Sequence, residues 1–147
     1  MKYWICVVSQ EHALRGIDGG FIQVCHGKKS PLARMKKGDY VTFYCPNITF
    51  QGKDKCQNFV GVGQVKDGIV YQYSMSETFH PYRMDIAYLE NSENYSTSIL
   101  PLIEKLQFIK NKKHWGYIFR YGHLAIELPD FKVILVAMGV KDLLLIE

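Results

Sequence analysis

The chain has 147 residues, of which 48% are apolar and 22% charged, and its formal net charge is +4. This length suits a single domain over residues 1–147 that buries a stable core without disulfides or metals. The composition excludes disordered, collagen-like and low-complexity chains, and no segment holds the roughly 18 apolar residues that a membrane helix needs. Since the first residues also lack the features of a signal peptide, we expect a cytoplasmic protein with no membrane partner.

The first third of the chain predicts short strands and short helices. Residues 3–8 form a near-continuous apolar run, which is typical of a central strand. Ser9 is expected to cap a short helix over 10–16. The next predicted elements are an extended stretch, a helix opened by a proline and a second strand, at 21–25, 31–35 and 40–45.

The middle of the chain predicts an antiparallel pair of strands. Residues 58–65 have strand character despite two glycines, and Lys66-Asp67-Gly68 is a strong hairpin signal. Residues 69–73 are therefore expected to run back as the partner strand. Asp130 is expected to cap the last helix of the chain. Two more strands are predicted at 82–89 and 115–120, and two more helices at 99–106 and 131–138. An apolar tail follows at 143–146.

Most neighbouring strands in this series are joined by hairpin-like turns rather than by helical crossovers. The predicted fold class is therefore α+β, with a mixed and strongly curved sheet. The sequence contains no internal repeat and no linker, which agrees with one domain.

Basic residues are concentrated in two windows that contain no acid. Residues 19–38 and residues 105–125 each hold five lysines and arginines. Outside these windows, eight basic residues face 14 acidic ones. Segregation of this kind is typical of a surface that meets polyanions such as nucleic acid. Ordinary solvated loops are the alternative explanation.

No motif in the sequence demands an enzyme, a cofactor or a metal. The glycines at 61 and 63 lack the third glycine of a dinucleotide-binding loop and precede a predicted hairpin. The five histidines show no metal-binding spacing, and the four cysteines form no C-x-x-C pair. Three of the four cysteines lie in apolar runs, where small core residues are expected. The cysteines are Cys6, Cys25, Cys45 and Cys56.

Aromatic residues make up 14% of the chain, and four of them stand out by their position. Phe21, Phe79, Tyr82 and Trp115 each lie at a predicted junction of loop and strand, beside basic or small residues. Exposed rings with basic flanks are typical of sites where a nucleic-acid base stacks. The alternative is that these rings cover the edges of the core.

Six segments in chain order together span nearly the whole chain: 3–9, 20–29, 31–39, 79–83, 106–109 and 115–120. Taken in this order, they resemble the sequence pattern of EVE domains. The resemblance implies a PUA-like fold, in which a curved mixed β-barrel is flanked by short helices. EVE domains are similar to YTH domains, which hold a methylated adenine of RNA in an aromatic cage, and are regarded as readers of modified bases.

The resemblance also implies roles for individual residues. Phe21 stands where YTH domains place a tryptophan of the cage, and a phenylalanine face attracts a cationic base less strongly than indole does. Phe79 or Tyr82 is expected to supply the opposite wall. The side chains expected to bind the edge of the base are Ser9, Gln10 and Gln23. The basic side chains expected to hold flanking phosphates are Lys28, Lys29, Arg34, Lys113 and Arg120.

The predicted function is a module that binds DNA or RNA and captures one modified base in an aromatic pocket, without catalysis. One alternative is a nuclease or a base-modifying hydrolase that uses the same pocket. Another is a domain for a small molecule or a protein, in which the basic windows are only solvated loops.

Overall fold

The computed structural model describes residues 1–141, and the predicted apolar tail at 143–146 lies outside them. Seven strands form one curved, mixed sheet in the order β2-β5-β4-β3-β1-β7, and β6 pairs with β4. Within residues 1–141, three α-helices and four short 3₁₀ helices surround the sheet. The predicted α+β class is thus confirmed. The strands are β1 (Tyr3–Val7), β2 (Phe21–Ile22), β3 (Tyr40–Asn47), β4 (Lys55–Gln72), β5 (Tyr82–Tyr88), β6 (Ser96–Ser98) and β7 (His123–Ile126).

Strand β1 lies inside the sheet, as its apolar run predicts. It pairs with β3 in parallel and with β7 in antiparallel orientation. Side chains of a strand alternate between the two faces of a sheet, so its residues enter two cores. Ile5 packs into one core, and Trp4 and Cys6 pack into the other. A strand buried on both faces needs apolar residues at consecutive positions, which is the pattern of β1.

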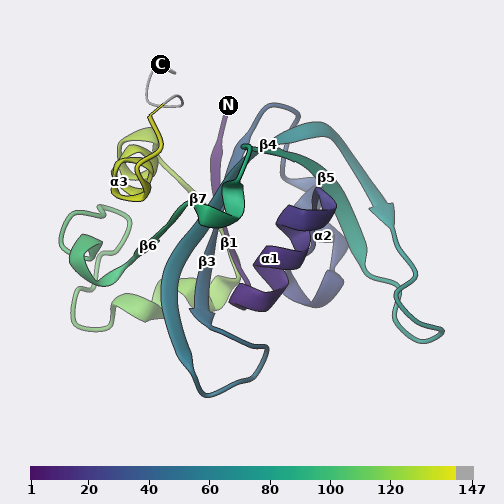
Figure 1. Ribbon diagram of the computed structural model, residues 1–147, viewed down its shortest axis with the longest axis horizontal. Coiled ribbons are helices and arrows are strands. Elements are labelled where there is room, and N and C mark those ends of the chain that lie inside the picture. Colours follow the sequence, from purple (N-terminus) through teal and green to yellow (C-terminus); the bar gives the residue numbers. More distant parts are fainter. Residues whose placement is uncertain (142–147) are drawn as a thin grey trace.

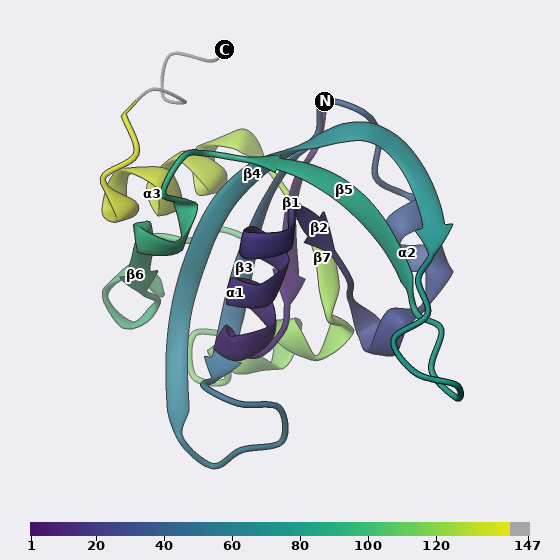
Figure 2. The same ribbon diagram turned by 45° about the vertical axis from the view of Figure 1, so that its right-hand side comes forward.

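The two cores are covered by different helices. Helices α1 (Gln10–Gly19) and α2 (Lys29–Ala33) lie on one side of the sheet, and α3 (Leu128–Met138) lies on the other (Figure 1). Strands β4 and β5 curve over α1, which gives the sheet its arched shape (Figure 2). The 3₁₀ helices are η1 (Cys25–Gly27), η2 (Ser92–Asn94), η3 (Leu100–Leu102) and η4 (Trp115–Tyr121).

Helix α1 begins where the sequence predicts it. The hydroxyl oxygen of Ser9 accepts a hydrogen bond from the backbone N–H of His12 at 3.2 Å, which satisfies a free donor of the first turn. The helix continues three residues beyond the predicted end. It stops at Gly20, whose φ of 73° is a left-handed conformation that glycine adopts without strain.

The predicted hairpin at 66–68 is wrong. Residues 55–72 form one continuous strand, β4, which pairs with β3 along its first part and with β5 along its last. The register against β5 shifts between Val65 and Val70, and Gly68 has a φ of 77°. The side chain of Asp67 accepts a hydrogen bond from the N–H of Ile69 at 2.9 Å. The turn-forming residues therefore make a bulge that bends the strand, where a hairpin would have reversed it.

The predicted strand at 115–120 is also wrong. This segment is the 3₁₀ helix η4, and the strand of this region is β7, which begins after Gly122. Phe119 is the buried residue of η4, and its ring stacks on Tyr44 with centroids 4.0 Å apart. One buried ring in a segment with exposed neighbours suits a short helix that touches the core on one side only. Tyr117 and Tyr121 are 53% and 76% exposed.

Three smaller predictions need correction in their boundaries. Helix α2 spans 29–33 instead of 31–35, and only the 3₁₀ helix η3 forms in the stretch 99–106. Asp130 lies in the first turn of α3 and does not cap it, because the helix begins at Leu128. Its carboxylate instead accepts hydrogen bonds from the N–H groups of Gln107 and Phe108, both at 2.8 Å. This ties the preceding loop to α3.

All four cysteines are free thiols. Cys6 and Cys45 are buried in the core, while Cys25 and Cys56 are half-buried. Burial raises the pKa of each thiol, since the thiolate is poorly solvated there. None of the helices within residues 1–141 is both long enough and apolar enough to cross a membrane.

Candidate nucleic-acid interface

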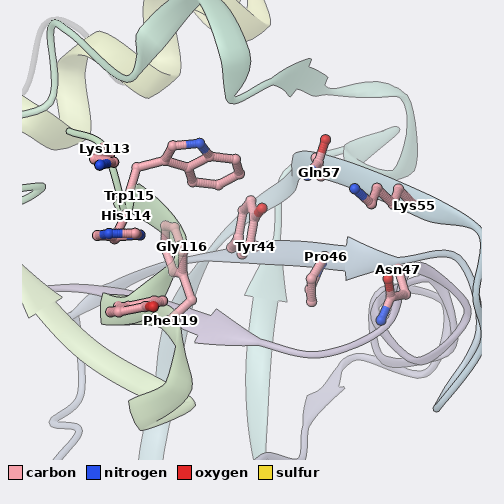
Figure 3. Close-up of a pocket in the computed structure, with 11 residues that line it drawn as sticks. Tyr44, Pro46, Asn47, Lys55, Gln57, Lys113, His114, Trp115, Gly116 and Phe119 are labelled. Carbon is pink, nitrogen blue, oxygen red and sulfur yellow. The ribbon is translucent and has the colours of Figure 1, made fainter. Parts of the chain in front are cut away.

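A pocket of about 310 Å³ lies between η4 and the neighbouring ends of β3 and β4 (Figure 3). Strand β3 contributes a buried tyrosine and β4 a lysine and a glutamine, while η4 and the residues before it contribute three aromatic rings, a histidine and a lysine. The lining residues are Tyr44, Pro46, Asn47, Lys55, Gln57, Lys113, His114, Trp115, Gly116, Tyr117 and Phe119.

Aromatic rings form the apolar part of this pocket. Tyr44 is 2% exposed and stacks on Phe119, so the two rings make a rigid floor. Trp115 is half-buried, and its indole projects over the pocket from η4 (Figure 3). Within residues 1–141, no ring or cation stacks on Trp115. Part of the indole packs against the apolar core, and an aromatic ring at the pocket can stack on a planar ligand.

The charged groups at the pocket are positive. Lys55 and Lys113 line it and are exposed, and the lining residues include no carboxylate. The guanidinium carbon of Arg120 lies 4.3 Å from the ring centroid of Tyr117, on which His114 also stacks at 4.9 Å. Of the predicted phosphate-binding residues, Lys113 thus lines the pocket, and Arg120 contacts Tyr117, which is one of its lining residues. Such an arrangement attracts anions.

The predicted base-binding residues Phe21 and Gln23 meet at a second place, around Arg83. The guanidinium carbon of Arg83 lies 3.8 Å from the ring centroid of Phe21 and 3.9 Å from that of Tyr73. Its Nε donates a hydrogen bond to Oε1 of Gln23 at 3.0 Å. The ring that faces Phe21 across Arg83 is therefore Tyr73, and the guanidinium occupies the space between them.

The other two predicted wall residues lie elsewhere in this region. Tyr82 and Arg83 are adjacent in β5, so their side chains point to opposite faces of the sheet. Tyr82 packs against the core under α1 and α2, and the amine of Lys29 lies 5.8 Å from its ring centroid. Phe79 is 40% exposed, and its ring approaches Gly27.

The remaining predicted residues occupy the ends of α1 and α2. The hydroxyl oxygen of Ser9 accepts the hydrogen bond that caps α1, and Gln10 is half-buried at the first position of that helix. Lys28, Lys29 and Arg34 are exposed around α2. Burial lowers the pKa of His12, which lies two positions after Gln10, and the charges of Arg15 and Arg83 add to this effect.

The sequence did not indicate several residues of the Trp115 pocket and of the cluster around Arg83. Tyr44 and Lys55 gave no signal, because one lies in a strand where packing explains it and the other in a polar loop. Trp115 was visible as an aromatic residue at a junction, beside the basic run that ends in Lys113. Arg83 lies outside both acid-free windows. No group of three or more His, Cys, Asp or Glu side chains in residues 1–141 is placed to hold a metal ion.

The curved mixed sheet with short flanking helices is the fold of EVE and PUA-like domains. The model of the EVE domain matches residues 2–137, and the chain belongs to this family. A relative, the UPF0310 protein YdcG of Bacillus subtilis, is 44% identical over 140 residues, which cover 95% of this chain and 94% of that protein. A UPF0310 protein of Streptococcus mutans is 42% identical over 96% of this chain and 99% of its own length.

Solved structures share the fold at low sequence identity. Rpa0253 from Rhodopseudomonas palustris has a TM-score of 0.60 and 14% identity, and covers 97% of this chain and 96% of its own. Human THYN1, solved in complex with DNA that contains 5-methylcytosine, has a TM-score of 0.54 and 11% identity. The match with THYN1 covers 96% of this chain and 99% of that chain.

Proposed function

We propose that this protein binds nucleic acid and captures one base in the pocket between Trp115 and Tyr44. The observation that carries the proposal is the indole face of Trp115, which has no stacking partner within the described residues and adjoins two lysines. A planar ligand that carries negative charge fits this combination, and a nucleotide has both properties. The THYN1 complex, in which a protein of the same fold binds DNA, supports the class of ligand.

The dimensions of the pocket suit a single unpaired nucleotide. Its volume of about 310 Å³ is at the lower end of the range for small-ligand sites, roughly 300–1,000 Å³. Stacking on one aromatic side chain contributes about 1–3 kcal/mol per base. The side chain of Gln57, which has both donor and acceptor atoms, lies at the pocket and is available to the edge of the base.

Flanking phosphates would be held by the basic residues that surround the pocket. Lys55 and Lys113 are closest to it, and Arg120 lies at its rim beside Tyr117. Lys28, Lys29 and Arg34 would extend this surface around α2. Contacts of this kind set the affinity without choosing the base, so sequence or modification must be read inside the pocket.

The finer part of the proposal is that the base is modified and that the protein binds it without catalysis, in the cytoplasm. The ligand in the THYN1 structure makes 5-methylcytosine the first modification to test. The pocket lining contains neither a carboxylate nor a thiol, and His114 is its one imidazole. No side-chain hydrogen bond within residues 1–141 positions the imidazole of His114 or the lysines and tyrosines of the lining. This favours binding over hydrolysis, since acid–base catalysis needs a positioned proton donor or acceptor.

Tryptophan fluorescence provides a direct test. The chain has two tryptophans, and Trp4 is 3% exposed in the core, so only Trp115 should respond to a ligand. We expect single-stranded oligonucleotides to quench the emission, and oligonucleotides with 5-methylcytosine to do so at lower concentration than unmodified ones. Trp115→Phe should abolish the quenching, and Trp115→Ala should weaken binding by about 1–3 kcal/mol.

The matched control is Tyr121→Ala, which removes an exposed ring at the end of the same 3₁₀ helix, outside the pocket. It should leave both the affinity and the quenching unchanged. If oligonucleotides bind without changing the Trp115 emission, or bind Trp115→Ala as tightly as the wild type, the pocket is not the base site. Cleavage or conversion of the oligonucleotide during the titration would contradict the proposed absence of catalysis.

A further inference from the structure

Arg83 is a charged side chain that is held almost entirely inside the protein. It is 9% exposed, and its guanidinium carbon lies 3.8 Å from the ring centroid of Phe21 and 3.9 Å from that of Tyr73. Oε1 of Gln23, itself 7% exposed, accepts a hydrogen bond from Nε at 3.0 Å. The two ring contacts and the hydrogen bond to Gln23 hold the guanidinium in place, since a planar guanidinium packs on aromatic rings and donates in fixed directions.

None of these three partners neutralises the charge of Arg83. The ion pair between Arg15 and Glu11 is the one salt bridge within residues 1–141. Asp85 lies two positions along β5 on the same face, but too far from the guanidinium to pair with it, and its carboxylate accepts a hydrogen bond from the hydroxyl of Tyr71 at 2.7 Å. Buried charges in proteins are ordinarily paired with an opposite charge. Arg83 is therefore a buried cation without an acidic partner within residues 1–141.

The terminal nitrogens of Arg83 remain available to a ligand. No hydrogen bond links either Nη atom to a described residue, since Nε makes the only one of this side chain. Yet the ring nitrogens of His123 are the only fully buried side-chain nitrogens or oxygens within residues 1–141 that lack a partner. The Nη atoms must therefore reach solvent. Two such donors in one rigid plane match two oxygens of a phosphate group.

We propose that Arg83, clamped by Phe21, Tyr73 and Gln23, is a binding site for the oxyanion of a phosphate group. The phosphate belongs either to the backbone of a nucleic acid or to a free nucleotide, and the experiment below separates the two. The site shares no residue with the pocket at Trp115, so the proposal does not depend on the base site there. Burial lowers the pKa of His12, and the charges of Arg15 and Arg83 make smaller contributions in the same direction.

The decisive variant is Gln23→Glu, which replaces the amide by a carboxylate of nearly the same shape. The new carboxylate would accept from Nε as Gln23 does and would also neutralise the guanidinium. If Arg83 only holds the fold together, this change leaves ligand binding intact. If Arg83 binds phosphate, the added charge removes the binding while the protein remains folded. Arg83→Gln tests the same point by deleting the charge, and Arg15→Gln is the control at an exposed arginine.

The experiment is a calorimetric titration of the full chain with three probes: inorganic phosphate, a nucleoside 5′-monophosphate and a single-stranded oligonucleotide without terminal phosphates. We expect Gln23→Glu and Arg83→Gln to weaken binding of at least one probe roughly tenfold to a hundredfold, as loss of charge-assisted hydrogen bonds does. Arg15→Gln should have no such effect. Thermal melts of each variant confirm that it is folded.

The pattern of probes identifies the source of the phosphate. Binding of phosphate or monophosphate that Gln23→Glu removes assigns the site to a free nucleotide, and an effect on the oligonucleotide alone assigns it to the nucleic-acid backbone. If Gln23→Glu, folded, binds all three probes as the wild type does, or if no probe binds the wild type, the inference is wrong. Trp115→Ala should not change phosphate binding, so failure at one place is distinguishable from failure at the other.

Discussion

Removing the two lysines of the Trp115 pocket should change how nucleic-acid binding depends on salt. Lys55 and Lys113 line the pocket and are exposed, so each is placed to contact a phosphate and release its counterions. Each lost contact lowers the slope of log affinity against log salt by about 0.7–0.9. For the double variant Lys55→Ala/Lys113→Ala, the slope should therefore become shallower by about 1.4–1.8.

This change in slope is large enough to measure. Between about 50 and 200 mM salt, the affinity of the wild type should fall about 7- to 12-fold more than that of the double variant. The assay is fluorescence anisotropy of a labelled oligonucleotide at four or more salt concentrations. Lys66→Ala, an exposed lysine of β4 outside the pocket, is the control and should keep the wild-type slope.

The comparison with Trp115→Ala makes the reasoning refutable. An uncharged ring releases no counterion, so this variant should lose affinity at every salt concentration and keep the wild-type slope. A double lysine variant with an unchanged slope would show that neither lysine meets a phosphate. A Trp115→Ala variant with a shallower slope would show that its effect comes from displacement of the basic side chains.

Two further predictions concern histidine titration and the cap of α1. Burial, with a smaller contribution from the charge of Arg34, lowers the pKa of His123 from 6.5 to about 4. The unfolded chain then binds the proton more readily, so the stability is full above pH 6.5 and falls by about 3 kcal/mol as the pH drops towards 4. His123→Phe, which keeps a ring stacked on Trp4, should flatten this part of the pH profile in urea unfolding, and an equally steep profile would refute the assignment. Ser9→Ala should lower the free energy of unfolding by about 0.5–2 kcal/mol, because the cap of α1 is lost. It should not change the affinity for oligonucleotides. A weaker affinity in a folded Ser9→Ala protein would instead support the base contact that the family resemblance implies.

The sequence was informative wherever one local signal determines the structure. The continuous apolar run of β1 identified a strand buried on both faces, and Ser9 identified the start of α1. It misled at 66–68, because Asp-Gly forms both hairpins and bulges, and pairing with β3 and β5 along one strand decided in favour of the bulge. The apolar residues at 115–120 suggest a strand, but the segment is a 3₁₀ helix in which Phe119 is the buried residue.

The candidate sites were only partly predictable, because they depend on contacts between distant segments. Lys113 and Arg120 lie in an acid-free window that the sequence shows, and the phosphate role expected of Arg120 comes from the family resemblance. Their partner Tyr44 comes from β3, about 70 positions away, and nothing in its local sequence distinguishes it from a core tyrosine. The family resemblance implies a base contact at Phe21, but it did not indicate that the guanidinium of Arg83 lies against the rings of Phe21 and Tyr73.

Arg83 shows why a count of charges along the sequence misses a site of this kind. A window around it contains Asp85, so the local charge is balanced and the segment looks ordinary. In the folded chain, Asp85 is engaged by Tyr71, and the groups that touch the guanidinium are two rings and an amide. What decides whether a charge is available to a ligand is the partner that the fold gives it. The exposed Arg15 is paired with Glu11, whereas the buried Arg83 has no acidic partner within the described residues. An anionic ligand should therefore stabilise the charge of Arg83 more than that of Arg15, because a buried, unpaired charge is costly.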